Sequence, residues 1–346
     1  MNFASDNAYG AHPAVLRALA DCNAGAVMGY GADPVTARAE AAIRDLFEAP
    51  EAVIRFAATG TAANALVCAQ LSPAGGRIYC HQDAHIQTSE CGAPEFFSHG
   101  AKLVTLAGAE GRMTADTLAE ALRRGAGGGL NGGRNAMVSI TNATEWGTVY
   151  APDQVAALAD LAHGAGVPLH VDGARFANAA ASLGCAPADM TWRAGVDALC
   201  FGGTKNGAMA AEAVVFFDPA LAAGFDFRRK QSGHVFSKQR FLAAQMLALV
   251  SDGLWLDLAI RANALASRLA EGVLAAGGGL LAPVQSNAVF ATIPAGAHRR
   301  ARAAGAIYHL WPDKSAEASD PVPIRLVTSW DTPDTDVEAF IALLAG

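Results

Sequence analysis

The chain alternates short apolar runs with segments in which apolar residues return every three or four positions. Continuous apolar runs indicate buried strands, and a period near 3.6 indicates amphipathic helices. We predict strands at 53–56, 77–80, 102–106, 136–140, 167–171, 196–201 and 213–217, and helices at 35–47, 61–71, 114–124 and 152–163. This βα repetition predicts an α/β fold with a mostly parallel sheet covered by helices.

The last third of the chain has a different pattern. Residues 241–274 keep a helical period with a break at Gly253, and strands are predicted at 288–293, 307–308 and 324–327. Helices are expected at 298–304 and after Pro333, which makes this part a small α+β domain. Because 346 residues exceed the size at which one core keeps growing, we predict an N-terminal arm at 1–33, a large domain at 34–240 and a small domain at 241–346.

Composition narrows the class of partner. The chain has 25 basic and 32 acidic residues, a net charge of −7, so its field disfavours nucleic acid and anionic membranes. No charged leader or apolar run near eighteen residues is seen, and the cysteines are scattered. We therefore expect a cytoplasmic protein with reduced thiols that acts on a small molecule.

Two segments carry the candidate chemistry. One contains Asp172 and Arg175, and the other contains Lys205 within a glycine-rich turn. Each comes at the end of an apolar run, so Asp172 and Lys205 should both lie at strand C-termini, where α/β sheets bind ligands. This pair suits pyridoxal phosphate, because the lysine can bond to its aldehyde and the carboxylate can keep its ring nitrogen protonated. Taken singly, each segment has an ordinary alternative: a turn whose Asp172 pairs with Arg175, and a solvated loop.

Thr59, Gly60 and Thr61 begin the helix predicted at 61–71. Free N–H groups at a helix start can bind phosphate. The alternative is an ordinary N-cap by either threonine. The presence of Asp172 and Lys205 favours the phosphate cradle.

Other ligand motifs carry less weight. Residues 127–132 fit the glycine pattern of dinucleotide-binding loops, but they follow a helix and precede a strand, so we predict a flexible loop. In residues 202–205 the threonine precedes the lysine, whereas in a loop that binds a nucleoside triphosphate the lysine comes first. A metal site from Cys80, His81 and His85, the histidines sharing a helix face, is a weak alternative, and we expect no metal.

These motifs, in this order, resemble the low-specificity L-threonine aldolases, from the opening residues 3–7 through residues 170–175 to residues 325–331. The resemblance implies the aspartate-aminotransferase fold with a seven-stranded sheet, pyridoxal 5'-phosphate as cofactor and a homodimer or homotetramer that shares its site between subunits. It also implies cleavage of L-threonine, L-allo-threonine and related β-hydroxy-α-amino acids to glycine and an aldehyde. The alternatives are a β-eliminating lyase or transaminase of the same fold, and a binding protein without turnover.

The resemblance also implies roles for particular residues. The catalytic set is Lys205, His85 and Asp172. The cofactor set adds Thr59, Gly60, Thr61, Arg175, Thr204 and Lys238. The substrate set is Ser5, Tyr30, Glu145, Arg175 and Arg325.

Three candidates remain for the general base: His85, Glu145 and a water molecule. Many relatives carry a histidine where this chain has Glu145. A histidine that titrates near neutrality suits the transfer better than a solvated carboxylate with a pKa near 4. We therefore expect His85 to be the base.

Overall fold

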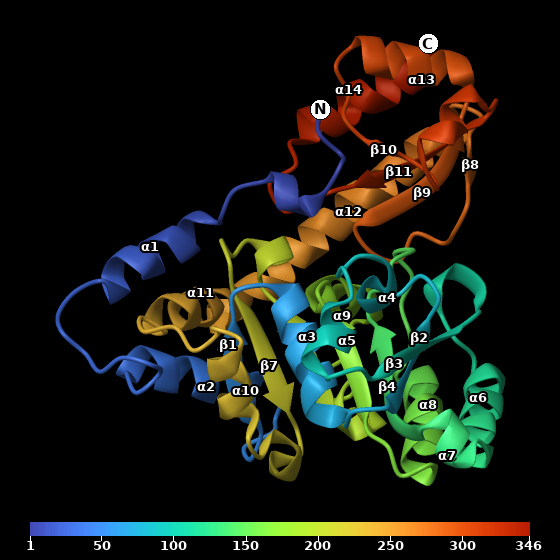
Figure 1. The fold of residues 1–346 in the computed structure, drawn as a ribbon. Coiled ribbons are helices and arrows are strands. Elements are labelled where there is room, and N and C mark those ends of the chain that lie inside the picture. The colour runs from blue at the N-terminus through green and yellow to red at the C-terminus, as the bar shows by residue number, and fades with distance from the viewer.

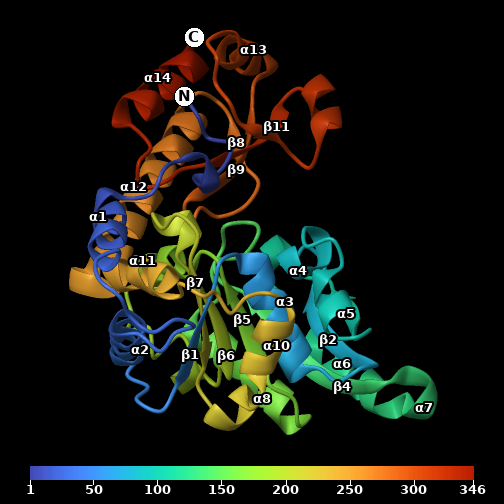
Figure 2. The ribbon, with the colours of Figure 1, turned by 60° about the vertical axis from the view of Figure 1, so that its left-hand side comes forward.

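The computed structural model describes residues 1–346 except for the side chains of residues 314 and 316. The chain forms two units, each built on its own sheet, and a long helix runs from one to the other (Figure 1). Figure 2 shows the smaller unit standing over one end of the larger one, with both chain termini on the smaller unit.

The larger unit contains a seven-stranded sheet in the order β1-β7-β6-β5-β4-β2-β3. Its strands are β1 (Val53–Ala57), β2 (Gly76–His81), β3 (Lys102–Leu106), β4 (Arg134–Thr141), β5 (Leu169–Gly173), β6 (Ala198–Gly202) and β7 (Glu212–Phe216). Strand β7 runs antiparallel to both of its neighbours, and the remaining pairs are parallel. The predicted α/β class with a mostly parallel sheet is confirmed.

Helices cover both faces of this sheet. The helices of this unit are α1 (Pro13–Cys22), α2 (Pro34–Leu46), α3 (Gly60–Leu71), α4 (His85–Thr88), α5 (Ala93–Phe97), α6 (Ala115–Gly127), α7 (Gly129–Gly132), α8 (Pro152–Gly164), α9 (Phe176–Leu183), α10 (Phe225–Gln231) and α11 (Arg240–Val250). The short α7 lies beside α6 without burying a residue. Short 3-10 turns lie at Asp6–Ala8, Ala109–Gly111, Trp192–Ala194, Thr204–Asn206, Pro219–Ala222, Ser251–Gly253 and Lys314–Ala318.

The strand period of two divides the core of the larger unit into two layers. On β6, Leu199 and Phe201 face the layer formed with α2, α8, α9 and α11, whereas Ala198 and Cys200 face the layer formed with α3. Both faces of the central strands are therefore buried, which explains why these strands read as continuous apolar runs.

The smaller unit is an antiparallel four-stranded sheet in the order β10-β11-β9-β8. Its elements are α12 (Leu254–Ala275), β8 (Gly279–Leu280), β9 (Ala288–Ile293), α13 (Ala295–Ala303), β10 (His309–Leu310), β11 (Val322–Val327) and α14 (Asp334–Ala345). Phe3 from the N-terminus enters this core and packs edge-on against Phe340, with 5.2 Å between the ring centroids.

Helix α12 belongs to both cores. Trp255 and Leu258 lie in the core of the larger unit, and Leu265 and Leu269 lie in that of the smaller one. The change of core therefore falls within α12, while the predicted domain boundary at residue 240 remains a prediction.

The apolar stretch Arg240–Ala275 has the length and composition of a membrane span. It consists of α11 and α12, which meet at a bend where Asp252 has a φ of 54°. The buried residues of both helices, such as Leu249 and Leu265, belong to the cores described above. These apolar faces therefore serve as core-helix surfaces in this fold.

Three sequence expectations are wrong in detail. The loop predicted at 127–132 contains the short helix α7, and the guanidinium of Arg77 lies against Gly132. The strand predicted at 307–308 lies at β10 instead, since Ile307 forms a bridge with Asn2. His81 ends β2 and His85 begins α4, so the two do not share a helix face.

Candidate functional site

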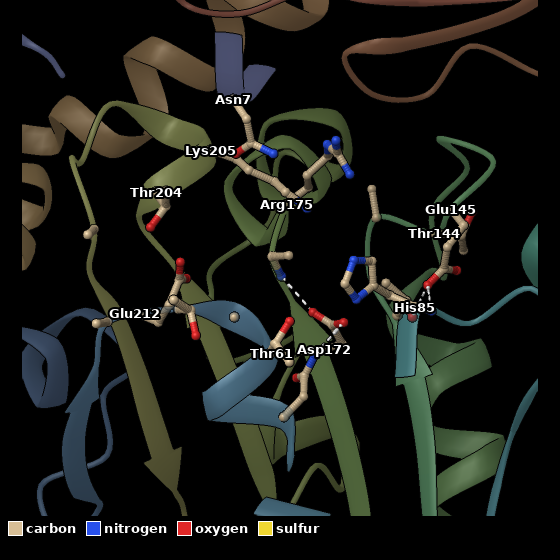
Figure 3. A pocket seen from close by; sticks show the side chains of 18 of the residues that line it. Asn7, Thr61, His85, Thr144, Glu145, Asp172, Arg175, Thr204, Lys205 and Glu212 are labelled. Atoms are coloured by element: carbon tan, nitrogen blue, oxygen red, sulfur yellow. Dashed lines mark hydrogen bonds between the residues drawn. The ribbon is translucent and has the colours of Figure 1, made fainter. Parts of the chain in front are cut away.

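A pocket of about 370 Å³ opens at the C-terminal edge of the larger sheet (Figure 3). The residues predicted for the site that line it are Thr59, Gly60, Thr61, His85, Glu145, Asp172, Arg175, Thr204 and Lys205. Parallel strands end at this edge, so side chains far apart in the sequence meet here.

Asp172 and Lys205 come from neighbouring strands. Asp172 lies near the end of β5 and is buried, and Lys205 lies in the turn that follows β6. The positive charge of Arg175 lowers the pKa of Lys205, and burial lowers it further. Asp172 accepts a hydrogen bond from Asn64 at 2.8 Å rather than forming the ion pair with Arg175 considered as the alternative.

Helix α3 begins at the wall of the pocket. Thr59 caps the helix, since its hydroxyl accepts a hydrogen bond from the N–H of Ala62 at 3.2 Å. The cap leaves the N–H groups of Gly60 and Thr61 at the positive end of the helix dipole, where an anion is stabilised. The cap and the anion site are therefore compatible.

His85 is half-buried and belongs to a hydrogen-bonded chain whose other members are buried. Its Nδ1 lies 2.8 Å from Glu90 Oε1, and Asn64 Nδ2 donates to both Glu90, at 2.9 Å, and Asp172, at 2.8 Å. The hydrogen bond to Glu90 raises the pKa of His85 despite burial. With Nδ1 held by Glu90, Nε2 of His85 remains for a ligand.

Glu145 is not the solvated carboxylate that the sequence suggested. Its Oε1 accepts hydrogen bonds from the Thr141 hydroxyl and the backbone N–H of His85, both at 2.8 Å. Its Oε2 is buried without a partner among the described residues. Burial raises the pKa of Glu145 to about 7, so the expected contrast in pKa with His85 is lost.

A buried ion pair joins the N-terminal arm to the pocket. Arg175 donates to Asp6 through Nε, at 2.7 Å, and Nη2, at 3.0 Å, and the Asp6 side chain is inaccessible to solvent. Asn287, from the smaller unit, also donates to Asp6 at 3.0 Å. One edge of the Arg175 guanidinium is therefore occupied, and its Nη1 is the part left for a ligand.

Ser5 and Arg325 do not line the pocket, but both lie close to this pair. Ser5 caps the turn that begins at Asp6, and Arg325 on β11 donates to the carbonyl of Ala4 at 3.3 Å. Burial and the charge of Arg175 lower the pKa of Arg325, and its Nε has no partner among the described residues.

Tyr30 and Lys238 lie outside the pocket. Both are exposed, and the N–H of Tyr30 donates to the carbonyl of Ser237 at 3.0 Å, which joins the two segments at the surface. Lys230 stacks on the Tyr30 ring at 4.9 Å. Neither predicted residue reaches the pocket of its own chain.

Comparison with known proteins assigns the family. The model of the β-eliminating lyases matches residues 2–295. A low-specificity L-threonine aldolase of Pseudomonas aeruginosa is 42% identical over 332 residues, which cover 95% of this chain and 93% of that protein. The chain belongs to the β-eliminating lyase family. Within this family it groups with the low-specificity L-threonine aldolases, as the motifs predicted.

Two further relatives agree with this assignment. The low-specificity L-threonine aldolase of a Pseudomonas species is 41% identical and spans 98% of this chain and 96% of its own. The threonine aldolase structure of Leishmania major superposes with a TM-score of 0.92 at 29% identity, over 99% of this chain and 98% of that one. The predicted fold of the aspartate-aminotransferase class is therefore confirmed.

Sequence reasoning missed several polar residues of this lyase site. They are Asp6, Asn7, Asn64, Glu90 and Glu212, of which Asn7, Asn64 and Glu212 line the pocket. For Glu90 the available signal was its place five residues after His85, in a polar segment. Asp6 and Asn64 gave no local signal, because Arg175, which pairs with Asp6, and Asp172, which pairs with Asn64, each lie more than a hundred residues away.

We expect Asp6→Asn to lower the free energy of unfolding by about 3 kcal/mol, because it leaves the largely buried Arg175 without its counter-charge. Burial alone would raise the pKa of Asp6, but Arg175 and Lys205 hold it below its ordinary value. The stabilisation is therefore present above the ordinary carboxyl pKa and is lost as pH falls through the lower, folded value. Urea unfolding from pH 7 to pH 3 measures it.

The control is Asp189→Asn, which removes an exposed ion pair with Arg193. This variant should change the free energy of unfolding by less than about 1 kcal/mol. Equal effects of the two substitutions at pH 7 would contradict the role given to Asp6.

Proposed function

We propose that the protein is a pyridoxal-phosphate-dependent aldolase that cleaves L-threonine, L-allo-threonine and related L-β-hydroxy-α-amino acids to glycine and an aldehyde. The observation that carries this proposal is the meeting of His85, Asp172 and Lys205 in one pocket. The relatives named L-threonine aldolases support the choice of reaction.

The residues present fit the cofactor. A volume of about 370 Å³ lies within the usual range of small-molecule sites, about 300–1,000 Å³. The start of α3 suits a phosphate, the buried carboxylate of Asp172 suits a protonated ring nitrogen, and Lys205 is a largely buried amine with a lowered pKa. When bound, pyridoxal phosphate supplies an acceptor for the electron pair released as the Cα–Cβ bond breaks.

The protein's own groups orient the substrate and move protons. Arg175, through Nη1, and Arg325 would hold the substrate carboxylate in the place where their charges converge. His85 would take the β-hydroxyl proton on Nε2, while Glu90 stabilises the resulting positive charge through Nδ1. Asn64 keeps Glu90 and Asp172 apart by donating to both, which limits repulsion between the two carboxylates.

The defining experiment supplies L-threonine, L-allo-threonine and phenylserine to the purified protein with added cofactor. We expect glycine and the matching aldehyde in equal amounts. Borohydride reduction followed by peptide mapping should find the cofactor on Lys205. Ammonia or a keto acid in place of glycine would instead indicate elimination or transamination, and cofactor binding without any product would indicate a binding protein.

The identity of the base can be tested with two variants. We expect His85→Asn to lower kcat by about 10²–10⁴-fold, the usual contribution of a general base. In the wild type, kcat should fall as pH drops through the raised pKa of His85, because the protonated ring cannot accept the proton. Glu145→Gln should lower kcat about tenfold, if Glu145 contributes through orientation.

Cofactor occupancy, read from the visible absorbance, serves as the control in both variants. A nearly unchanged kcat in His85→Asn, together with a large loss in a fully loaded Glu145→Gln, would identify Glu145 as the base. The raised pKa of Glu145 makes this comparison informative.

We further propose a homodimer or homotetramer in which segments of one copy complete the site of another. Tyr30 and Lys238, predicted for the site, are exposed outside their own pocket, and the apolar side chains of Met28 and Phe227 are 72% and 78% exposed. Apolar patches of this kind favour association. Light scattering should give at least twice the chain mass for the active protein; an active monomer would refute the proposal.

We also propose that the protein works in the cytoplasm. Its six cysteines are free thiols, of which Cys91 is exposed, as is usual in a reducing compartment. Fractionation of cells of the source organism tests this location.

A further inference from the structure

Glu212 lies between the start of α3, where the phosphate of the cofactor would bind, and the turn that carries Lys205. It is the first residue of β7, and in the sheet it pairs with Ala57 of β1 on one side and with Gly202 of β6 on the other. Strand β1 leads directly into the start of α3, and β6 leads into the turn that carries Lys205. In Figure 3 the Glu212 side chain accordingly lies among the pocket residues, on the side of Thr204.

The carboxylate of Glu212 is buried among uncharged partners. The residue is 5% exposed, and its Oε2 accepts a hydrogen bond from the N–H of Gly203 at 3.1 Å. The Thr204 hydroxyl is its second partner. Because neither partner carries a charge, burial dominates and raises the pKa of Glu212 to about 7.

The surrounding charges are few. Lys205, on the turn after β6, favours the ionised form of Glu212, and Asp172, on β5, opposes it. The end of β1 and the first turn of α3 face this corner with the uncharged residues 57–61. Glu212 is thus balanced near neutral pH, and one further negative charge nearby would shift it to the protonated form.

We propose that Glu212 takes up a proton from solvent when the phosphate group of the cofactor binds at the start of α3. The inference rests on the proposed use of pyridoxal phosphate and goes beyond it, because it couples capture of the cofactor to protonation. A phosphate dianion at the helix start and an ionised carboxylate on the adjoining strand repel each other inside a pocket of low dielectric. Protonation removes this repulsion while the hydrogen bond from Gly203 is kept.

The test uses cofactor-free, full-length protein and pyridoxine 5'-phosphate. This probe carries the phosphate but has an alcohol in place of the aldehyde, so it cannot bond to Lys205. Titration calorimetry at pH 8, in two buffers of different ionisation enthalpy, counts the protons taken up on binding. The wild type should take up close to one proton more than Glu212→Gln, whose amide cannot titrate.

The dissociation constant reports the same coupling. Above pH 7.5 it should rise more steeply with pH in the wild type than in Glu212→Gln, by up to roughly tenfold per pH unit. Glu90→Gln is the matched control, since Glu90 is also a buried glutamate with a raised pKa but lies beside His85. On binding the probe, Glu90→Gln should take up the same number of protons as the wild type.

The outcomes separate the two proposals. If the wild type does not bind the probe, both the cofactor assignment and this inference fail. If it binds with the same proton uptake as Glu212→Gln, only the role of Glu212 fails. If Glu212→Gln does not fold, as judged by circular dichroism, inorganic phosphate binding to the wild type decides: above pH 8, where inorganic phosphate is already a dianion, binding should weaken with pH, and constant or stronger binding would overturn the inference.

Discussion

The ion pair between Asp6 and Arg175 is the interaction on which the arrangement of this site depends. Asp6 comes from the N-terminal arm, Arg175 follows β5 of the larger unit, and Asn287 of the smaller unit donates to the same carboxylate. Three parts of the chain therefore meet at one buried charge. An unpaired charge at this depth is costly, so each part holds the other two in position.

The sequence predicted the parts of the fold that depend on local patterns. Strands β5 and β6 are buried on both faces, and their apolar runs revealed them and placed Asp172 and Lys205 at one edge. Pairings between distant residues left no such pattern. Asp6 lies 169 residues from Arg175, and Ile307 pairs with Asn2 at the far end of the chain. Glu145 was misjudged because burial, which sets its pKa, depends on the surrounding fold.

The pocket divides its acidic residues between two kinds of environment. Glu90 and Asp172 share the amide of Asn64, and hydrogen bonds from His85 and Asn64 favour the ionised form of Glu90, although burial raises its pKa. Glu145 and Glu212 are buried against uncharged donors, and both have a pKa of about 7. The site therefore combines a glutamate that faces a histidine with two glutamates whose charge near neutral pH depends on their uncharged surroundings and on any ligand that binds beside them.

Helix α12 gives the molecule a mechanical property. Its 22 residues make a rod about 33 Å long, anchored in both cores. Near its first turn, the carbonyl of Trp255 accepts a hydrogen bond from Asn206, the neighbour of Lys205, at 2.7 Å. This rod is therefore a mechanical connection: its first turn is hydrogen-bonded to the turn that carries Lys205, and its later turns pack in the core of the smaller unit. The position of the lysine turn is thus tied, through one continuous helix, to a sheet that has no strand in common with the one that carries the pocket.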